Sequence, residues 1–142
     1  MKRLIFIFFV GLTTAATVFA FQPIEQGLLS QTQLARIEKQ LAANLQSAVA
    51  RQQVDAALVL HRMIEIAPGH EWNRCVIPLM QILNRETNES ASRVLAAMVL
   101  HELRSERGDF AISRNAQFTD DQRVKRYCTI LTRTRLLEKI KS

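Results

Sequence analysis

The sequence is poor in the residues that interrupt regular structure. Its 142 residues include only four glycines and three prolines, with two cysteines, one tryptophan and one tyrosine. A sandwich or barrel needs a turn about every 8–12 residues, so this scarcity argues against a many-stranded fold. Two cysteines are too few for a disulfide-dense chain. A hydrophobic content of 48% with 23% charged residues also excludes a disordered chain. The composition therefore predicts a small all-α domain.

The N-terminus has the pattern of a secretory signal peptide. Lys2 and Arg3 precede an uncharged apolar stretch, residues 4–19, and Val18-Phe19-Ala20 ends it with small residues at the positions that a signal peptidase reads. An uncleaved anchor is the alternative, although the stretch is slightly short for a span of about 20 residues. We expect cleavage after Ala20 and a periplasmic or secreted protein. We expect the membrane to be a partner only if residues 1–20 are retained as an anchor.

The remaining chain is long enough for one domain and too short for two. We expect a signal peptide at 1–20, an extended lead-in at 21–29 and one helical domain at 30–142. Apolar residues that recur every three or four positions predict six helices, at about residues 31–48, 54–66, 71–84, 89–104, 110–115 and 120–140. Gly108 is expected to close the connection before the fifth of them.

Local signals refine the expected helix ends. Ser30 with Gln33, and Thr119 with Gln122, match the capping box that opens a helix. Pro78 lies within the third apolar run, where it either kinks the helix or marks its first turn.

An internal repeat is the most specific pattern in the chain. Residues 54–61 match residues 94–101 at an offset of 40, with six of eight positions identical. A weaker echo at an offset of 30 relates Arg93-Val94 to Arg123-Val124. Periods of 30–40 residues with two helices each indicate a stacked helical repeat, because one helical hairpin cannot bury its apolar face alone.

The segment from Val76 to Gly108 resembles a HEAT-like repeat. Pro78-Leu79 in its first helix, and Arg93 and Ala96-Ala97 in its second, stand where such repeats carry these residues. Residues 108–126 are similar to a terminal unit of exported bacterial HEAT-like proteins of unknown function. The resemblance implies a short right-handed stack of about three helical hairpins, a HEAT-like α-solenoid. An irregular helical bundle is the alternative.

The resemblance further implies a non-enzymatic module that binds a protein in the cell envelope, although a fold alone does not fix a function. The second helices would line the binding surface, with these residues as candidates: Arg62, Arg93, Glu102, Arg123, Lys125 and Arg126.

The charge distribution suggests an alternative partner. Residues 104–142 hold ten basic and five acidic side chains, and the excess is concentrated in the last helix. That helix would suit an anionic envelope polymer or lipid, with binding that weakens steeply with salt. Nucleic acid is excluded as a partner if the chain is exported.

Catalytic and cofactor motifs are absent from the sequence, which has no GxSxG, SxxK, HExxH or glycine-rich phosphate loop. We therefore predict no enzyme, no cofactor and no metal. A metal site built on His61 and His101 is the alternative, and Glu65 and Glu102 are its nearest further ligands.

The two cysteines, Cys75 and Cys128, leave two possibilities open. Export to an oxidising compartment would permit a disulfide bond between them. Each also lies on an apolar helical face, where a free cysteine packs as a small hydrophobic residue.

Overall fold

The structure is a computed structural model that describes residues 29–141. Over that range the chain forms six α-helices and no strand, which confirms the all-α prediction. The predicted signal peptide and residues 21–28 of the lead-in lie outside the described range. None of the described helices combines the length and the apolar character needed to cross a bilayer. The helices are α1 (Gln31–Leu45), α2 (Ala50–Ile66), α3 (Asn73–Asn84), α4 (Ser90–Glu102), α5 (Glu106–Phe118) and α6 (Gln122–Lys141).

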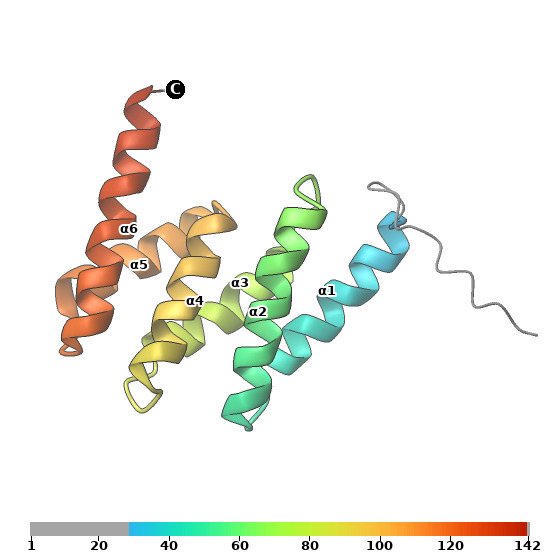
Figure 1. Cartoon of the computed structure of the whole chain (residues 1–142), viewed down its shortest axis with the longest axis horizontal. Helices are drawn as coiled ribbons and strands as arrows, with labels where there is room; N and C mark the ends of the chain where they lie inside the picture. The colour runs from blue at the N-terminus through green and yellow to red at the C-terminus, as the bar shows by residue number, and fades with distance from the viewer. Residues whose placement is uncertain (1–28, 142) are drawn as a thin grey trace, which may run out of the picture.

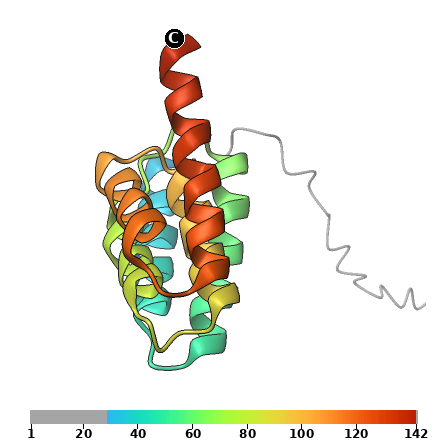
Figure 2. The same ribbon diagram turned by 90° about the vertical axis from the view of Figure 1, so that its left-hand side faces the viewer.

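Consecutive helices pair as three hairpins, α1–α2, α3–α4 and α5–α6, that stand side by side in chain order (Figure 1). Seen along the row, α1, α3 and α5 form one layer and α2, α4 and α6 form the other (Figure 2). The C-terminal part of α6 extends beyond the rest of the molecule. Each layer therefore turns one broad outer side to solvent, here called the α1/α3/α5 face and the α2/α4/α6 face.

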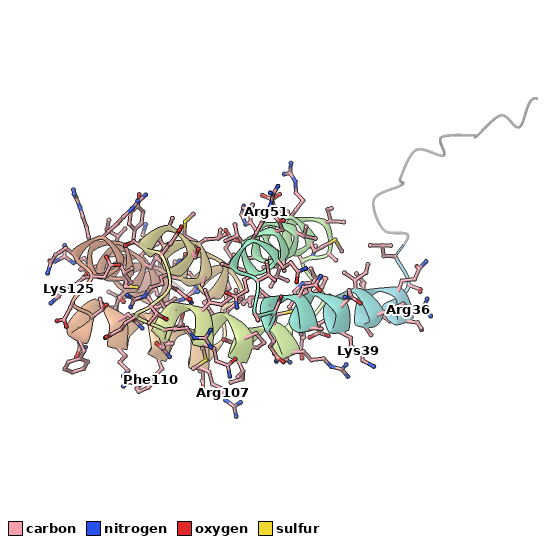
Figure 3. All side chains as sticks on the ribbon, turned by 90° about the horizontal axis from the view of Figure 1, so that it is seen from below. Arg36, Lys39, Arg51, Arg107, Phe110 and Lys125 are labelled. Atoms are coloured by element: carbon pink, nitrogen blue, oxygen red, sulfur yellow. The ribbon has the colours of Figure 1, made fainter. Side chains whose placement is uncertain are left out.

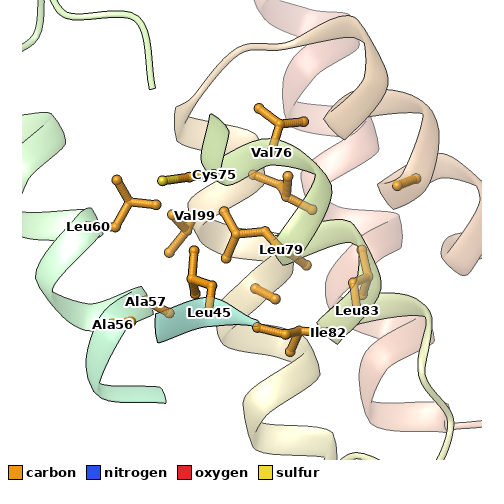
Figure 4. Close-up of a cluster of buried hydrophobic side chains, with 14 of the residues drawn as sticks. Leu45, Ala56, Ala57, Leu60, Cys75, Val76, Leu79, Ile82, Leu83 and Val99 are labelled. Atoms are coloured by element: carbon orange, nitrogen blue, oxygen red, sulfur yellow. The ribbon is translucent and has the colours of Figure 1, made fainter. Parts of the chain in front are cut away.

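The core lies between the two layers and is built mainly from leucine, valine and alanine (Figure 4). The offset of 40 residues seen in the sequence relates positions that are buried in both hairpins. The pairs are Gln53 and Arg93, Ala56 and Ala96, Ala57 and Ala97, and Leu60 and Leu100.

The polar pair in this series does the same task in both hairpins. The Gln53 side chain donates a hydrogen bond to the carbonyl oxygen of Ser47 at 2.7 Å. The Arg93 Nε donates to the carbonyl oxygen of Leu83 at 2.8 Å. Leu83 lies in the last turn of α3, where the helix itself supplies no donor, and Ser47 lies in the loop that follows α1. In each hairpin a side chain of the second helix thus binds a carbonyl at or just beyond the end of the first.

Arg93 also binds residues of the third hairpin. Its side chain is buried, with only 2% of its surface exposed. Its Nη2 donates to Asn115 Oδ1 at 3.2 Å and to Thr119 Oγ1 at 2.9 Å. Its Nη1 lies 3.7 Å from a carboxylate oxygen of Asp121. Asp121 also accepts a hydrogen bond from the Ser90 hydroxyl, which is the largest cause of its lowered pKa. One guanidinium therefore joins α3, α4, α5 and the start of α6.

The helix starts were predicted with mixed success. At α1 the capping box is confirmed, since Ser30 and Gln33 exchange side-chain to backbone hydrogen bonds. At α6 the predicted cap, Thr119, is wrong. Asp121 accepts the first amide hydrogen bonds of that helix instead. The hydroxyl of Thr119 is occupied by Arg93, a tertiary contact that the local pattern does not contain.

The fifth helix is longer than predicted. It begins at Glu106 behind an N-cap at Ser105 and ends at Phe118, so Gly108 lies within its first turn rather than closing a connection. A Cβ at Gly108 would lie 2.8 Å from the Ser105 hydroxyl and 3.3 Å from Leu100. The glycine is thus used for close approach to α4. Pro78 lies inside α3 rather than in its first turn.

We expect Arg93→Met to lower the free energy of unfolding by about 3 kcal/mol, because it leaves buried polar partners without a donor. Equilibrium urea unfolding followed by circular dichroism measures the change. Arg62→Met is the matched control, since Arg62 forms an exposed ion pair with Glu65 that water screens. Equal unfolding midpoints for the two variants would contradict the role given to Arg93.

Candidate functional site

A cleft in the described part of the chain lies between two loops on the same side of the molecule. Residues 67–72 connect α2 to α3, and residues 103–105 connect α4 to α5. Together with neighbouring helix ends they enclose a volume of about 370 Å³. The polar lining residues are His70, Glu71, Asn73, Glu102, Arg104 and Ser105, and the apolar ones include Ile64, Trp72 and Val76.

A buried polar cluster lies at one wall of this cleft. Glu38 of α1 is buried, and its carboxylate accepts the backbone N–H of Arg74 at 2.8 Å, at the start of α3. The other carboxylate oxygen lies 3.4 Å from His70 Nε2. The rings of His70 and Trp72 meet edge to face, with their centroids 4.5 Å apart. The carboxylate therefore supports the positive end of the α3 dipole, whereas His70 Nε2 lies near it without a hydrogen bond.

Trp72 is buried by this packing, and its indole N–H has no hydrogen-bond acceptor among the described residues.

The role of Glu38 in the cluster was not predicted from the sequence, because a glutamate in a surface helix is ordinarily solvated. The apolar spacing of α1 contains the relevant signal: Glu38 falls between Leu34 and Leu41 on the buried side.

The two repeated histidines do not converge. His61 Nδ1 lies 2.6 Å from Glu102 Oε2, so α2 and α4 are joined by this pair. His101 lies on the side of α4 toward α6, where burial and then the nearby Arg135 lower its pKa. No group of three histidine, cysteine, aspartate or glutamate side chains in residues 29–141 is arranged to hold a metal ion. The alternative metal site on His61 and His101 is therefore not assembled in the structure.

The cysteines are separate and free. Cys75 packs at the start of α3, with its thiol 3.8 Å from the backbone oxygen of Glu38, whereas Cys128 is buried in the middle of α6. Of the two possibilities for these residues, the structure shows buried free thiols rather than a disulfide bond. Burial raises the pKa of Cys75 to about 12 and that of Cys128 to about 11, so neither is a nucleophile near neutral pH.

The predicted interaction residues are divided by the fold. Arg62 is exposed on α2, and Arg123 and Arg126 are exposed on α6. Lys125 is partly buried at the end of the molecule where α6 begins, labelled in Figure 3. Glu102 is partly buried and engaged by His61.

Arg93 does not belong to that surface. Its position in the repeat faces the core, and its guanidinium is satisfied there by Leu83, Asn115 and Thr119. The prediction placed it on the surface because the second helix of each hairpin was expected to line the binding face.

The α2/α4/α6 face carries aliphatic side chains between charges that pair with each other. Leu58 is 49% exposed and Met98 is 42% exposed, and the repeat places them at the same position of successive hairpins. On α2 the neighbouring charges form two pairs along the helix, Arg51 with Asp55 and Arg62 with Glu65. The face is thus apolar at its centre without an excess of either charge on α2.

Comparison with known proteins adds no relative: no protein family, no curated protein and no solved structure matches this chain.

The thiol environments predict a reactivity pattern. In protein purified without reductant, Cys75 and Cys128 should not react with Ellman's reagent at pH 8, because the raised pKa values leave almost no thiolate and burial blocks access. After unfolding in urea, two thiols per chain should react. Fast labelling of the native protein, or no thiols after unfolding, would refute the buried free state.

Proposed function

We propose that the chain is an exported, non-enzymatic module that binds a protein partner in the cell envelope through its α2/α4/α6 face. We also propose that its three hairpins are a short HEAT-like α-solenoid. The shared burial of positions 40 residues apart supports the solenoid, as does the packing of each hairpin on its neighbours. The sequence pattern of residues 1–20 supports export.

The exposed pair Leu58 and Met98 carries the proposal for protein binding. Single exposed aliphatic residues are ordinary on protein surfaces. Here the exposure recurs at equivalent positions of adjacent hairpins, with charges along α2 already neutralised by Asp55 and Glu65. Such a surface offers an apolar centre and polar surroundings, the usual composition of a protein-binding patch.

Catalysis has less support from the described residues. The cleft between the two loops is lined by His70 and Glu102, but both cysteine thiols lie in the core with raised pKa values. Neither thiol can act as an activated nucleophile beside a histidine base.

Site-specific photocrosslinking in the exporting cell tests the proposal. With benzoylphenylalanine in place of Leu58 or Met98, ultraviolet light should give discrete protein adducts of the same mass from both positions. The same probe at Gln81, an exposed position of α3, is the control. Adding Met98→Asp to the probe at 58 should remove the adduct, because a charge in the apolar centre must be desolvated on binding. No adduct from either position, or the same adduct from all three, would contradict the proposal.

A further inference from the structure

The α1/α3/α5 face carries exposed cations on each of its three helices. The exposed cations on its helices are Arg36 and Lys39 on α1, Arg74 on α3, and Arg107 and Arg114 on α5. Figure 3 shows Lys39 and Arg107 pointing to one side of the molecule, away from Arg51 on the opposite layer. The positive charge is therefore spread over all three helices of the layer.

None of these five cations forms an ion pair with another described residue. The acids on the same helices are engaged elsewhere, apart from Glu106, which is exposed in the first turn of α5. Glu38 is buried toward the core, and Asp109 pairs with Arg135 of α6 at 3.1 Å. The face thus has an uncompensated positive charge, which attracts an anionic partner.

Large apolar side chains stand among these cations. Phe110 is 69% exposed and Phe118 is 74% exposed. Spacings of three and four residues place Arg107, Phe110, Arg114 and Phe118 along one side of α5. At an offset of 33 residues, α3 repeats the arrangement with Arg74 and the exposed Ile77. Cations and apolar groups therefore alternate on neighbouring helices.

The face is also broad. Packed helices lie roughly 8–10 Å apart and are about 10 Å thick, and 13 residues of helix are about 20 Å long, so three helices side by side form a plate of about 20 Å by 30 Å. Figure 2 shows α1, α3 and α5 in one layer. A plate of this size meets a surface rather than enclosing a small ligand.

We propose that the α1/α3/α5 face binds the surface of a bilayer that contains anionic lipid. The cations contact the headgroups, and Phe110 and Phe118 insert at the boundary between headgroups and acyl chains. Basic side chains with interspersed phenylalanine are the combination that holds a helix in this interface. A hydrated anionic polymer satisfies the cations but offers no apolar depth to the phenylalanines. This inference uses the face opposite to the proposed protein-binding face and does not depend on it.

Vesicle co-sedimentation of the full chain tests the proposal, with vesicles of 30 mol% phosphatidylglycerol in phosphatidylcholine. Arg74→Glu with Arg107→Glu should weaken binding about 100-fold, because each reversal replaces an attractive charge by a repulsive one. Arg51→Glu with Arg62→Glu makes the same change in net charge on the opposite layer and should alter binding by less than about twofold. Every variant has the same N-terminal segment, so a difference in binding between the two double variants reports on the α1/α3/α5 face.

Two further arms separate the apolar from the ionic contribution. Phe110→Ser should weaken binding about tenfold, whereas Leu58→Ser, an exposed aliphatic position on the opposite layer, should leave it unchanged. Binding of the wild-type chain should fall steeply between 50 and 300 mM salt.

Three results would overturn the proposal. Equal binding by both double variants would show that the α1/α3/α5 face does not contact the bilayer. Equal binding of the wild-type chain to vesicles of phosphatidylcholine alone would show that anionic lipid is not required. Tight binding to dextran sulfate or to an oligonucleotide, without binding to vesicles, would assign the face to a soluble polyanion. Circular dichroism of each variant confirms that the helices are retained.

Discussion

The arrangement of the hairpins depends on the guanidinium of Arg93. A buried cation is costly unless each of its donors is satisfied, and here the acceptors come from the end of α3, from α5 and from the start of α6. Apolar packing alone tolerates small sliding of helices, whereas a planar group with fixed donor directions accepts few arrangements. The second and third hairpins are thereby held in one register. In the first hairpin the equivalent residue, Gln53, donates a hydrogen bond to a single carbonyl oxygen. Its amide is neutral, so this link between helices is weaker than that of Arg93.

Two outer faces of different chemistry follow from this register. Because each hairpin contributes one helix to each layer, residues that recur between hairpins accumulate on the same side (Figures 1 and 3). Leu58 and Met98 lie on the α2/α4/α6 face, while the α1/α3/α5 face combines exposed cations with Phe110 and Phe118. A module that rests on a membrane with one layer can present the other layer to a protein, so the two proposals are compatible without requiring each other.

Local and repeated patterns predicted the helices well, and long-range contacts account for the errors. The cap at Ser30 uses partners three residues away, so the sequence contains the whole interaction. At Thr119 the expected cap is lost to Arg93, 26 residues away. Likewise, the offset of 40 between α2 and α4 relates positions that are buried in both helices. Arg93 was nevertheless expected on the surface, because membership of a second helix does not show which side of that helix a residue occupies. The α1/α3/α5 face was not foreseen, because its charges come from three separate helices and form no local run.

The opposition of the two faces can be measured directly with an environment-sensitive fluorophore on a single introduced cysteine. Gln81→Cys places it on the α1/α3/α5 face and Met98→Cys on the α2/α4/α6 face, while the native thiols are buried. On adding vesicles with anionic lipid, we predict a blue-shifted emission from position 81 and no shift from position 98. Equal shifts at both positions, or a shift at 98 alone, would contradict the arrangement.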